Sequence, residues 1–247
     1  MVRRTPLIQV LPPLLALLCA YLASAQDLNK PPFPEWRDST VLRVLTDSPW
    51  SKRVNVPLQW TRRDEQPITY KDVPGADRSP ARTPGAPVGG SPIGGIGVPR
   101  SKLPSEASLI IRWASALPVR QAVALYKQRD AKLEPSKINE LVGVPSPDYI
   151  VEIRGVPAEI AHSGAESVEL IARQGSLLTT RTGRTIRPSR ATVSIQGTTL
   201  TIQVHFPRAD PLRKEEHSVE FSGNFQIFEV KQTFRLAAMT YLGHLEL

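Results

Sequence analysis

One cysteine, few aromatic residues and a single long apolar run limit what this 247-residue sequence can be. The cysteine is Cys19, and aromatic residues make up only 6% of the chain. A disulfide-stapled scaffold and a thiolate metal site are excluded, because each needs several cysteines. A polytopic membrane protein is excluded because only one uncharged apolar stretch is present. The 24 prolines and 15 glycines exclude a coiled coil or a helical bundle.

The apolar run lies at the N-terminus and has the three parts of a secretory signal. Two arginines precede the apolar residues 14–23, and Ala23-Ser24-Ala25 is an A-x-A cleavage site. We therefore expect residues 1–25 to be removed on export to the periplasm or the extracellular space, with no transmembrane span afterwards. Lipid attachment at Cys19 is disfavoured, because Leu18 stands where a lipid-attachment signal needs a small residue.

Composition divides the remaining chain into three parts. Residues 26–73 are predicted to hold an extended proline-rich lead-in and the first strands, and residues 105–247 the other strands, the helices and an antiparallel sheet. Between them, residues 74–104 contain seven prolines, seven glycines and no aromatic residue. Such a segment buries too little apolar surface to offset its ordering entropy, so it is predicted to be a disordered insertion. We expect the two flanking parts to form one folded unit.

Hydrophobic periodicity predicts an α+β fold, mostly antiparallel β, with one main amphipathic helix. That helix is expected from about Ala116 to Leu133, capped by Ser115, and a short second helix from Ser136 to Val142. The apolar stripe of the main helix would consist of Val119, Ala122, Val123, Tyr126 and Leu133. Strands are predicted at residues 41–45, 53–61, 108–115, 149–156, 167–172, 192–195, 198–206, 218–221 and 226–236, the last four pairing as two hairpins. Pro57 marks an edge strand, because proline cannot donate to a ladder.

The sequence carries none of the local motifs that mark common catalytic and cofactor sites. A P-loop, a dinucleotide fingerprint, a nucleophile elbow and a Ser-x-x-Lys signature are all missing. The histidines are scattered, and none forms a metal-ligating pair: His162, His205, His217 and His244. We therefore expect no cofactor and no metal, and a non-catalytic role is favoured. A two-carboxylate hydrolase stays open as the alternative, because such pairs come from distant positions and leave no local trace.

Three segments are distinctive along the chain: Ser48-Pro49-Trp50-Ser51-Lys52, the stretch from Trp113 to Ala122, and Gly243-His244-Leu245-Glu246-Leu247. In these segments the chain resembles a family of exported bacterial proteins of unknown function. The resemblance covers most of the chain after the signal, apart from the Pro/Gly-rich insertion. It implies an envelope or secreted location and transfers no activity, cofactor or catalytic residue.

No acidic residue occurs between Glu169 and Asp210, and four arginines recur there at every third position. They are Arg181, Arg184, Arg187 and Arg190. A polyproline-like extension has three residues per turn and would place all four on one face. Because arginine binds phosphate and carboxylate groups through two parallel hydrogen bonds, the pattern predicts a polyanion-binding site. The same pattern also fits a solvated loop between strands whose arginines keep the protein soluble, and this simpler interpretation is favoured.

These patterns together predict an exported, non-catalytic, envelope-associated binding or scaffolding protein. Its expected partner is an envelope polyanion or another envelope protein. Nucleic acid is the weakest candidate, because the interleaved aromatic residues of a single-strand platform are missing. The alternative function is a cofactor-free hydrolase acting on envelope polymers. A cleft with two carboxylates about 5–10 Å apart would favour the hydrolase, whereas a flat basic face or a large exposed apolar patch would favour the binding protein.

Overall fold

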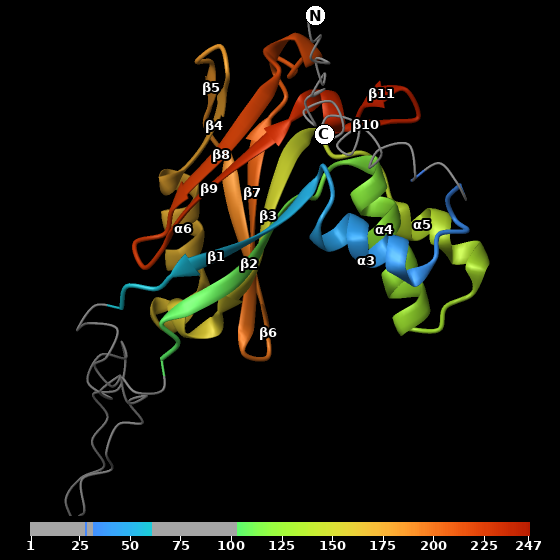
Figure 1. Ribbon diagram of the computed structural model, residues 1–247. Coiled ribbons are helices and arrows are strands. Elements are labelled where there is room, and N and C mark those ends of the chain that lie inside the picture. Colours follow the sequence, from blue (N-terminus) through green and yellow to red (C-terminus); the bar gives the residue numbers. More distant parts are fainter. Residues whose placement is uncertain (1–27, 29–31, 61–102) are drawn as a thin grey trace, which may run out of the picture.

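A computed structural model describes residue 28, residues 32–60 and residues 103–247 of the chain. The predicted signal segment with Cys19, and residues 74–102 of the predicted insertion, lie outside the described residues. The strands on either side of that insertion pair directly with each other, so both described segments contribute to one sheet (Figure 1).

Two antiparallel sheets form the body of the protein, which is α+β and mostly antiparallel β as predicted. The larger has the order β1-β2-β3-β7-β6, with bounds β1 Ser51–Pro57, β2 Glu106–Trp113, β3 Asp148–Pro157, β7 Thr199–Pro207 and β6 Arg190–Gln196. The smaller has the order β5-β4-β8-β9, with bounds β5 Thr185–Ile186, β4 Ser176–Thr180, β8 Ser218–Asn224 and β9 Glu229–Arg235. A separate ribbon pairs β10 Thr240–Tyr241 with β11 His244–Leu245.

Aromatic residues join the two sheets in the core. Phe206 of β7 packs edge to face on Phe221 of β8, and Trp113 of β2 packs in the same way on Phe234 of β9. Alternate residues of each strand point into this core, because strand side chains alternate between the two faces. The opposite face of each sheet is left for polar residues.

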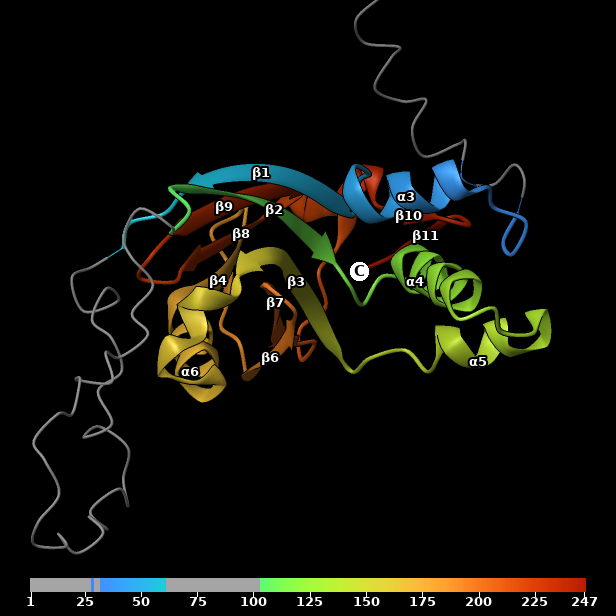
Figure 2. The same cartoon turned by 90° about the horizontal axis from the view of Figure 1, so that it is seen from below.

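Two groups of helices lie on different sides of the sheets (Figure 2). α3 Asp38–Thr46, α4 Leu117–Asp130, the 3-10 helix η4 Pro135–Lys137 and α5 Ile138–Val142 gather on one side, where Arg129 of α4 pairs with Asp38 of α3. α6 Ala165–Gly175 follows η5 Ala158–Ser163 and packs on β6. Two further 3-10 turns are η6 Lys214–Glu216 and η7 Leu236–Ala238.

Two predicted strands are helices. Residues 41–45 lie in α3, where Val41, Val44 and Leu45 are buried at helical spacing. Residues 167–172 lie in α6, which buries Val168 and Ala172, four positions apart. In both cases a short apolar window suggested a strand, whereas the buried positions follow the helical period. The protein therefore has more than one substantial helix.

The main helix is confirmed as α4, but two of the five residues of its predicted apolar stripe are wrong. Val119 and Ala122 are fully buried, whereas the side chains of Tyr126 and Leu133 are exposed. Ser115 does not cap this helix either. Its hydroxyl oxygen accepts a hydrogen bond from the backbone N–H of Ile150, 3.0 Å away, and so ties the strand–helix corner to β3.

Both predicted hairpins are present. Gln196 pairs with Thr199, so Gly197 lies in the two-residue turn between β6 and β7 with φ +60°. In the other hairpin Asn224 still pairs with Glu229, which moves the turn from the predicted Gly223-Asn224 to residues 225–228. β1, which contains Pro57, is an edge strand as predicted.

Candidate functional site

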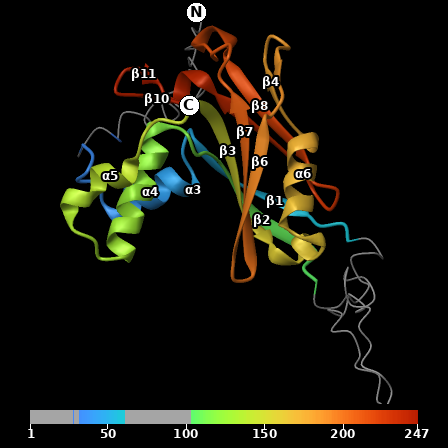
Figure 3. The same ribbon diagram turned by 180° about the vertical axis from the view of Figure 1, so that it is seen from behind.

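The face of the larger sheet that points away from the smaller one is polar; we name it the outer polar face. Strand pairing aligns one row of residues across all five strands: Ser51, Arg112, Glu152, Gln203 and Thr192. The next row contains Arg53, Ile110, Arg154, Thr201 and Ser194. Paired residues share a face, so both rows lie on the same side of the sheet. β3, β7 and β6 run side by side in Figure 3.

A buried ion pair lies in the first row. Arg112 Nη2 is 2.7 Å from Glu152 Oε1, and only 6% and 5% of these side chains are exposed. Gln203 Nε2 donates to the other carboxylate oxygen of Glu152 at 2.8 Å. Burial lowers the pKa of Arg112, and the charge of Glu152 opposes that effect. Arg154 also approaches the same carboxylate, at 3.7 Å, so two cations share one anion.

A buried histidine lies beside this pair. His205 is paired across the strands with Ile150 and Arg190, and its Nδ1 lies 3.8 Å from Asp148 Oδ2. Burial lowers the pKa of His205; the charge of Arg190 adds to this, and Asp148 opposes it. The lowered pKa favours the neutral form of the ring. Neither ring nitrogen has a hydrogen-bond partner within the described part of the chain.

The four arginines of the predicted ladder do not lie on one continuous extended segment. The chain turns sharply after β4, where Gly183 has φ +87°, and returns as β5 before entering β6. A polyproline-like extension is therefore not formed. Arg181 and Arg187 are exposed, Arg190 is exposed at the start of β6, and Arg184 is partly buried.

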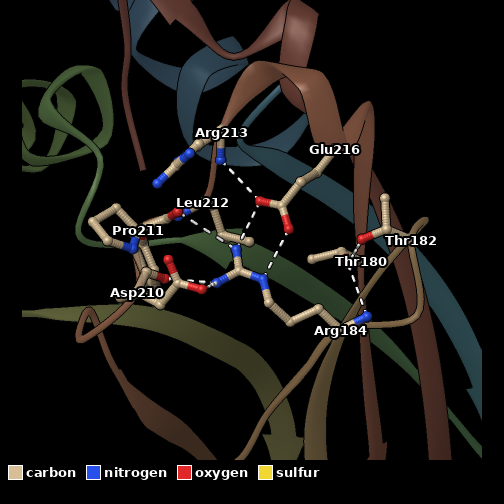
Figure 4. Close-up of polar contacts among 9 residues, drawn as sticks. Thr180, Thr182, Arg184, Asp210, Pro211, Leu212, Arg213 and Glu216 are labelled. Atoms are coloured by element: carbon tan, nitrogen blue, oxygen red, sulfur yellow. Dashed lines mark hydrogen bonds and ion pairs between the residues drawn. The ribbon is translucent and has the colours of Figure 1, made fainter.

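Arg184 is the centre of a polar network that fixes this hairpin (Figure 4). Its Nε and Nη2 donate to the two carboxylate oxygens of Glu216 at 2.9 and 2.7 Å. Its Nη1 donates to Asp210 Oδ2 at 2.6 Å and to the carbonyl oxygen of Asp210 at 2.8 Å. The backbone N–H of Arg213 also donates to Glu216, at 2.9 Å. Partial burial acts to raise the pKa of Glu216, but the hydrogen bonds from Arg184 and Arg213 outweigh it, so that pKa is lowered.

Arg184→Gln is expected to lower the free energy of unfolding at pH 7 by about 1–2 kcal/mol, because it removes a bidentate, partly buried carboxylate contact. Since the pKa of Glu216 is lowered in the folded state, its contribution is present above the ordinary carboxyl pKa and is lost as the pH falls through the folded value. Urea unfolding at pH 7 and at pH 3 should show the difference between wild type and variant shrinking in acid. A difference that grows in acid contradicts this account; Arg181→Gln, at an exposed position, is the control.

The Arg112–Glu152 pair was not predicted, although the sequence contains a sign of it. Each residue is a lone charge between apolar neighbours, Ile111 and Trp113 for Arg112, and Val151 and Ile153 for Glu152. Opposite charges that are each flanked by apolar residues in two strands are an indication of a buried pair. Their register could not be read from the sequence.

The three distinctive segments of the sequence meet in space. The backbone N–H of Trp113 donates to the carbonyl oxygen of Trp50 at 2.7 Å. Trp50 Nε1 donates to the carbonyl oxygen of Glu246 at 2.8 Å. The carboxylate of Glu246 accepts from the backbone N–H of Leu117, at the start of α4, at 3.3 Å. These contacts tie the first strand, the main helix and the last strand to one another.

Within residues 28, 32–60 and 103–247, no three His, Cys, Asp or Glu side chains gather so that they could hold a metal ion. In the same ranges no helix is long and apolar enough to cross a membrane. Comparison of the chain with protein-family models, with curated proteins and with solved structures finds no match.

Proposed function

We propose that the chain is an exported, non-catalytic, envelope-associated module that binds a polyanion. One observation carries the proposal. In a segment without acidic residues, Arg181, Arg187 and Arg190 are exposed, while Arg184 fixes the backbone between them through Glu216 and Asp210. Arginines on a fixed hairpin lose less conformational entropy when they bind than arginines on a free loop. Export rests on the signal pattern of residues 1–25.

The carboxylates of the outer polar face give less support to the hydrolase. Asp148 and Glu152 point to the same face of β3 but are four residues apart, which separates their backbones by about 13 Å. A two-carboxylate glycosidase site needs about 5–10 Å. Glu152 is also bound to Arg112 and Gln203, so it is poorly placed to exchange protons with a substrate.

The test is the binding of heparin and of long-chain polyphosphate as a function of salt. The variant R181Q/R187Q/R190Q is compared with R37Q/K127Q/K132Q, which removes the same charge from exposed positions in and around α3 and α4. We expect wild type to bind at least one polymer. In R181Q/R187Q/R190Q the slope of log K against log salt should become less steep by about three, because each lost contact releases one counterion fewer. The control should change the slope by less than one.

The proposal fails if wild type binds neither polymer, or if both triple variants weaken binding equally. The second outcome would show only a general effect of net charge. It would return the three arginines to the role of solubilising residues.

A further inference from the structure

Three arginines of the outer polar face reach solvent: Arg53 and Arg190 are exposed, and Arg154 is partly exposed. Arg53 and Arg154 belong to the same row, on β1 and β3, with the half-buried Ile110 of β2 between them. Two strand spacings separate them, which is about 9–10 Å. Arg190 lies on β6 at the opposite edge of the sheet, with 61% of its side chain exposed.

The carboxylates of this face are largely withdrawn from solvent. Glu152 is buried beneath its contacts with Arg112 and Gln203, and Asp148, near His205 and Arg190, is 19% exposed. Among the outward-pointing residues of the five strands, the exposed carboxylate is that of Glu106, the first residue of β2, which pairs with Pro57. The accessible charge on the central strands of the outer polar face is therefore positive.

Arg154 in particular keeps an excess charge. The carboxylate that it approaches already lies closer to Arg112, at 2.7 Å against 3.7 Å. One negative charge thus faces two positive charges, and 42% of the Arg154 side chain is exposed. Arg112 is the buried partner of the pair, and Arg154 is the cation available to a ligand.

We infer that the outer polar face binds an acidic polysaccharide laid across the strands, with its carboxylate or sulfate groups on Arg53, Arg154 and Arg190. This deepens the proposed function and rests on it. Hydroxyl and amide side chains fill the face between these arginines and can pair with sugar hydroxyls: Asn55, Ser108, Thr192, Ser194, Thr201 and Gln203. The face holds no Trp, Tyr or Phe among the outward-pointing residues of the five strands, so it lacks the stacking surface that single-stranded nucleic acid uses.

The spacing of the row supports a polymer rather than a small anion. Guanidinium groups on backbones about 9–10 Å apart do not converge on one phosphate, but they match charges that repeat along an extended chain. Arg190 is also one of the three exposed arginines, with Arg181 and Arg187, on which the proposed function rests. The discriminating residues are therefore Arg53 and Arg154, which the predicted ladder did not include.

The experiment measures binding of the full chain to alginate, a polymer of uronic acids, and to long-chain polyphosphate, across a salt series. R53Q/R154Q is compared with R37Q/K127Q, a control of equal charge change away from this face. We expect R53Q/R154Q to bind alginate roughly tenfold more weakly at low salt, with a slope lower by about two. R53K/R154K should restore part of the affinity, because the charge returns without the bidentate geometry. Since Arg53 is exposed, Arg154 is partly exposed and Arg112 still pairs with Glu152, the melting temperature should change little.

Each outcome decides a different point. Alginate binding by R53Q/R154Q that equals wild type overturns the inference while the proposed function stands. Binding of polyphosphate but not of alginate by wild type overturns the polysaccharide assignment alone. Failure of wild type to bind alginate, polyphosphate or heparin overturns both the inference and the proposed function.

Discussion

Arg112→Ala is expected to lower the free energy of unfolding by about 3–5 kcal/mol, because it leaves the buried carboxylate of Glu152 without its nearest cation. The two side chains are 6% and 5% exposed and 2.7 Å apart. After the substitution, Gln203 still donates one hydrogen bond and Arg154 lies 3.7 Å away. Neither contact replaces a direct charge-assisted bond inside the sheet. Urea unfolding followed by far-UV circular dichroism measures the loss.

The double variant R112L/E152L distinguishes a lost ion pair from lost packing. Replacing both members of a buried pair by apolar side chains of similar volume is often neutral or stabilising, so we expect this variant to be far more stable than Arg112→Ala. Arg53→Ala, in the neighbouring row of the same face, should stay within about 0.5 kcal/mol of wild type because Arg53 is exposed. A loss below about 1 kcal/mol for Arg112→Ala would mean that Arg154 takes over the carboxylate, and would refute the assigned geometry.

The parts of the fold that the sequence predicts are those with a long, regular pattern. β2, β3 and α4 are each eight residues or longer, so their apolar positions repeat often enough to separate strand alternation from the helical period. α3 and α6 were mistaken for strands because each contributes only two or three buried residues, too few to separate the helical period from alternation. The turn from β4 to β5 was not predicted because it depends on hydrogen bonds from Arg184 to Asp210 and Glu216, which are distant in sequence.

The candidate site is less predictable than the fold for a topological reason. β7 lies between β3 and β6, so Arg53, Arg154 and Arg190 reach one face only through pairings between strands far apart in sequence. Local spacing instead suggested a ladder of four arginines. It could not show that Glu216 and Asp210, 32 and 26 residues beyond Arg184, would bind that one arginine. One residue of the predicted ladder, Arg190, lies on the outer polar face.

Trp113→Ala is expected to lower the free energy of unfolding by about 3–5 kcal/mol, because a large buried side chain is lost and a cavity is left between the two sheets. Trp113 is fully buried. Its ring packs edge to face on Tyr149 of β3 at 5.7 Å and on Phe234 of β9 at 5.5 Å, measured between ring centroids. The resulting cavity would lie between the sheets, where the backbone of both is fixed by strand pairing and cannot collapse.

Trp113→Phe keeps an aromatic ring in this position and tests whether packing carries the effect. The indole Nε1 is buried without a hydrogen-bond partner in the described part of the chain, so removing it leaves no acceptor unpaired. We expect Trp113→Phe to lose less than half as much stability as Trp113→Ala. Thermal unfolding and near-UV circular dichroism measure stability and the order of the remaining aromatic residues. Equal losses for both variants would show that the indole itself, through its size or its N–H, is what the core requires at this position.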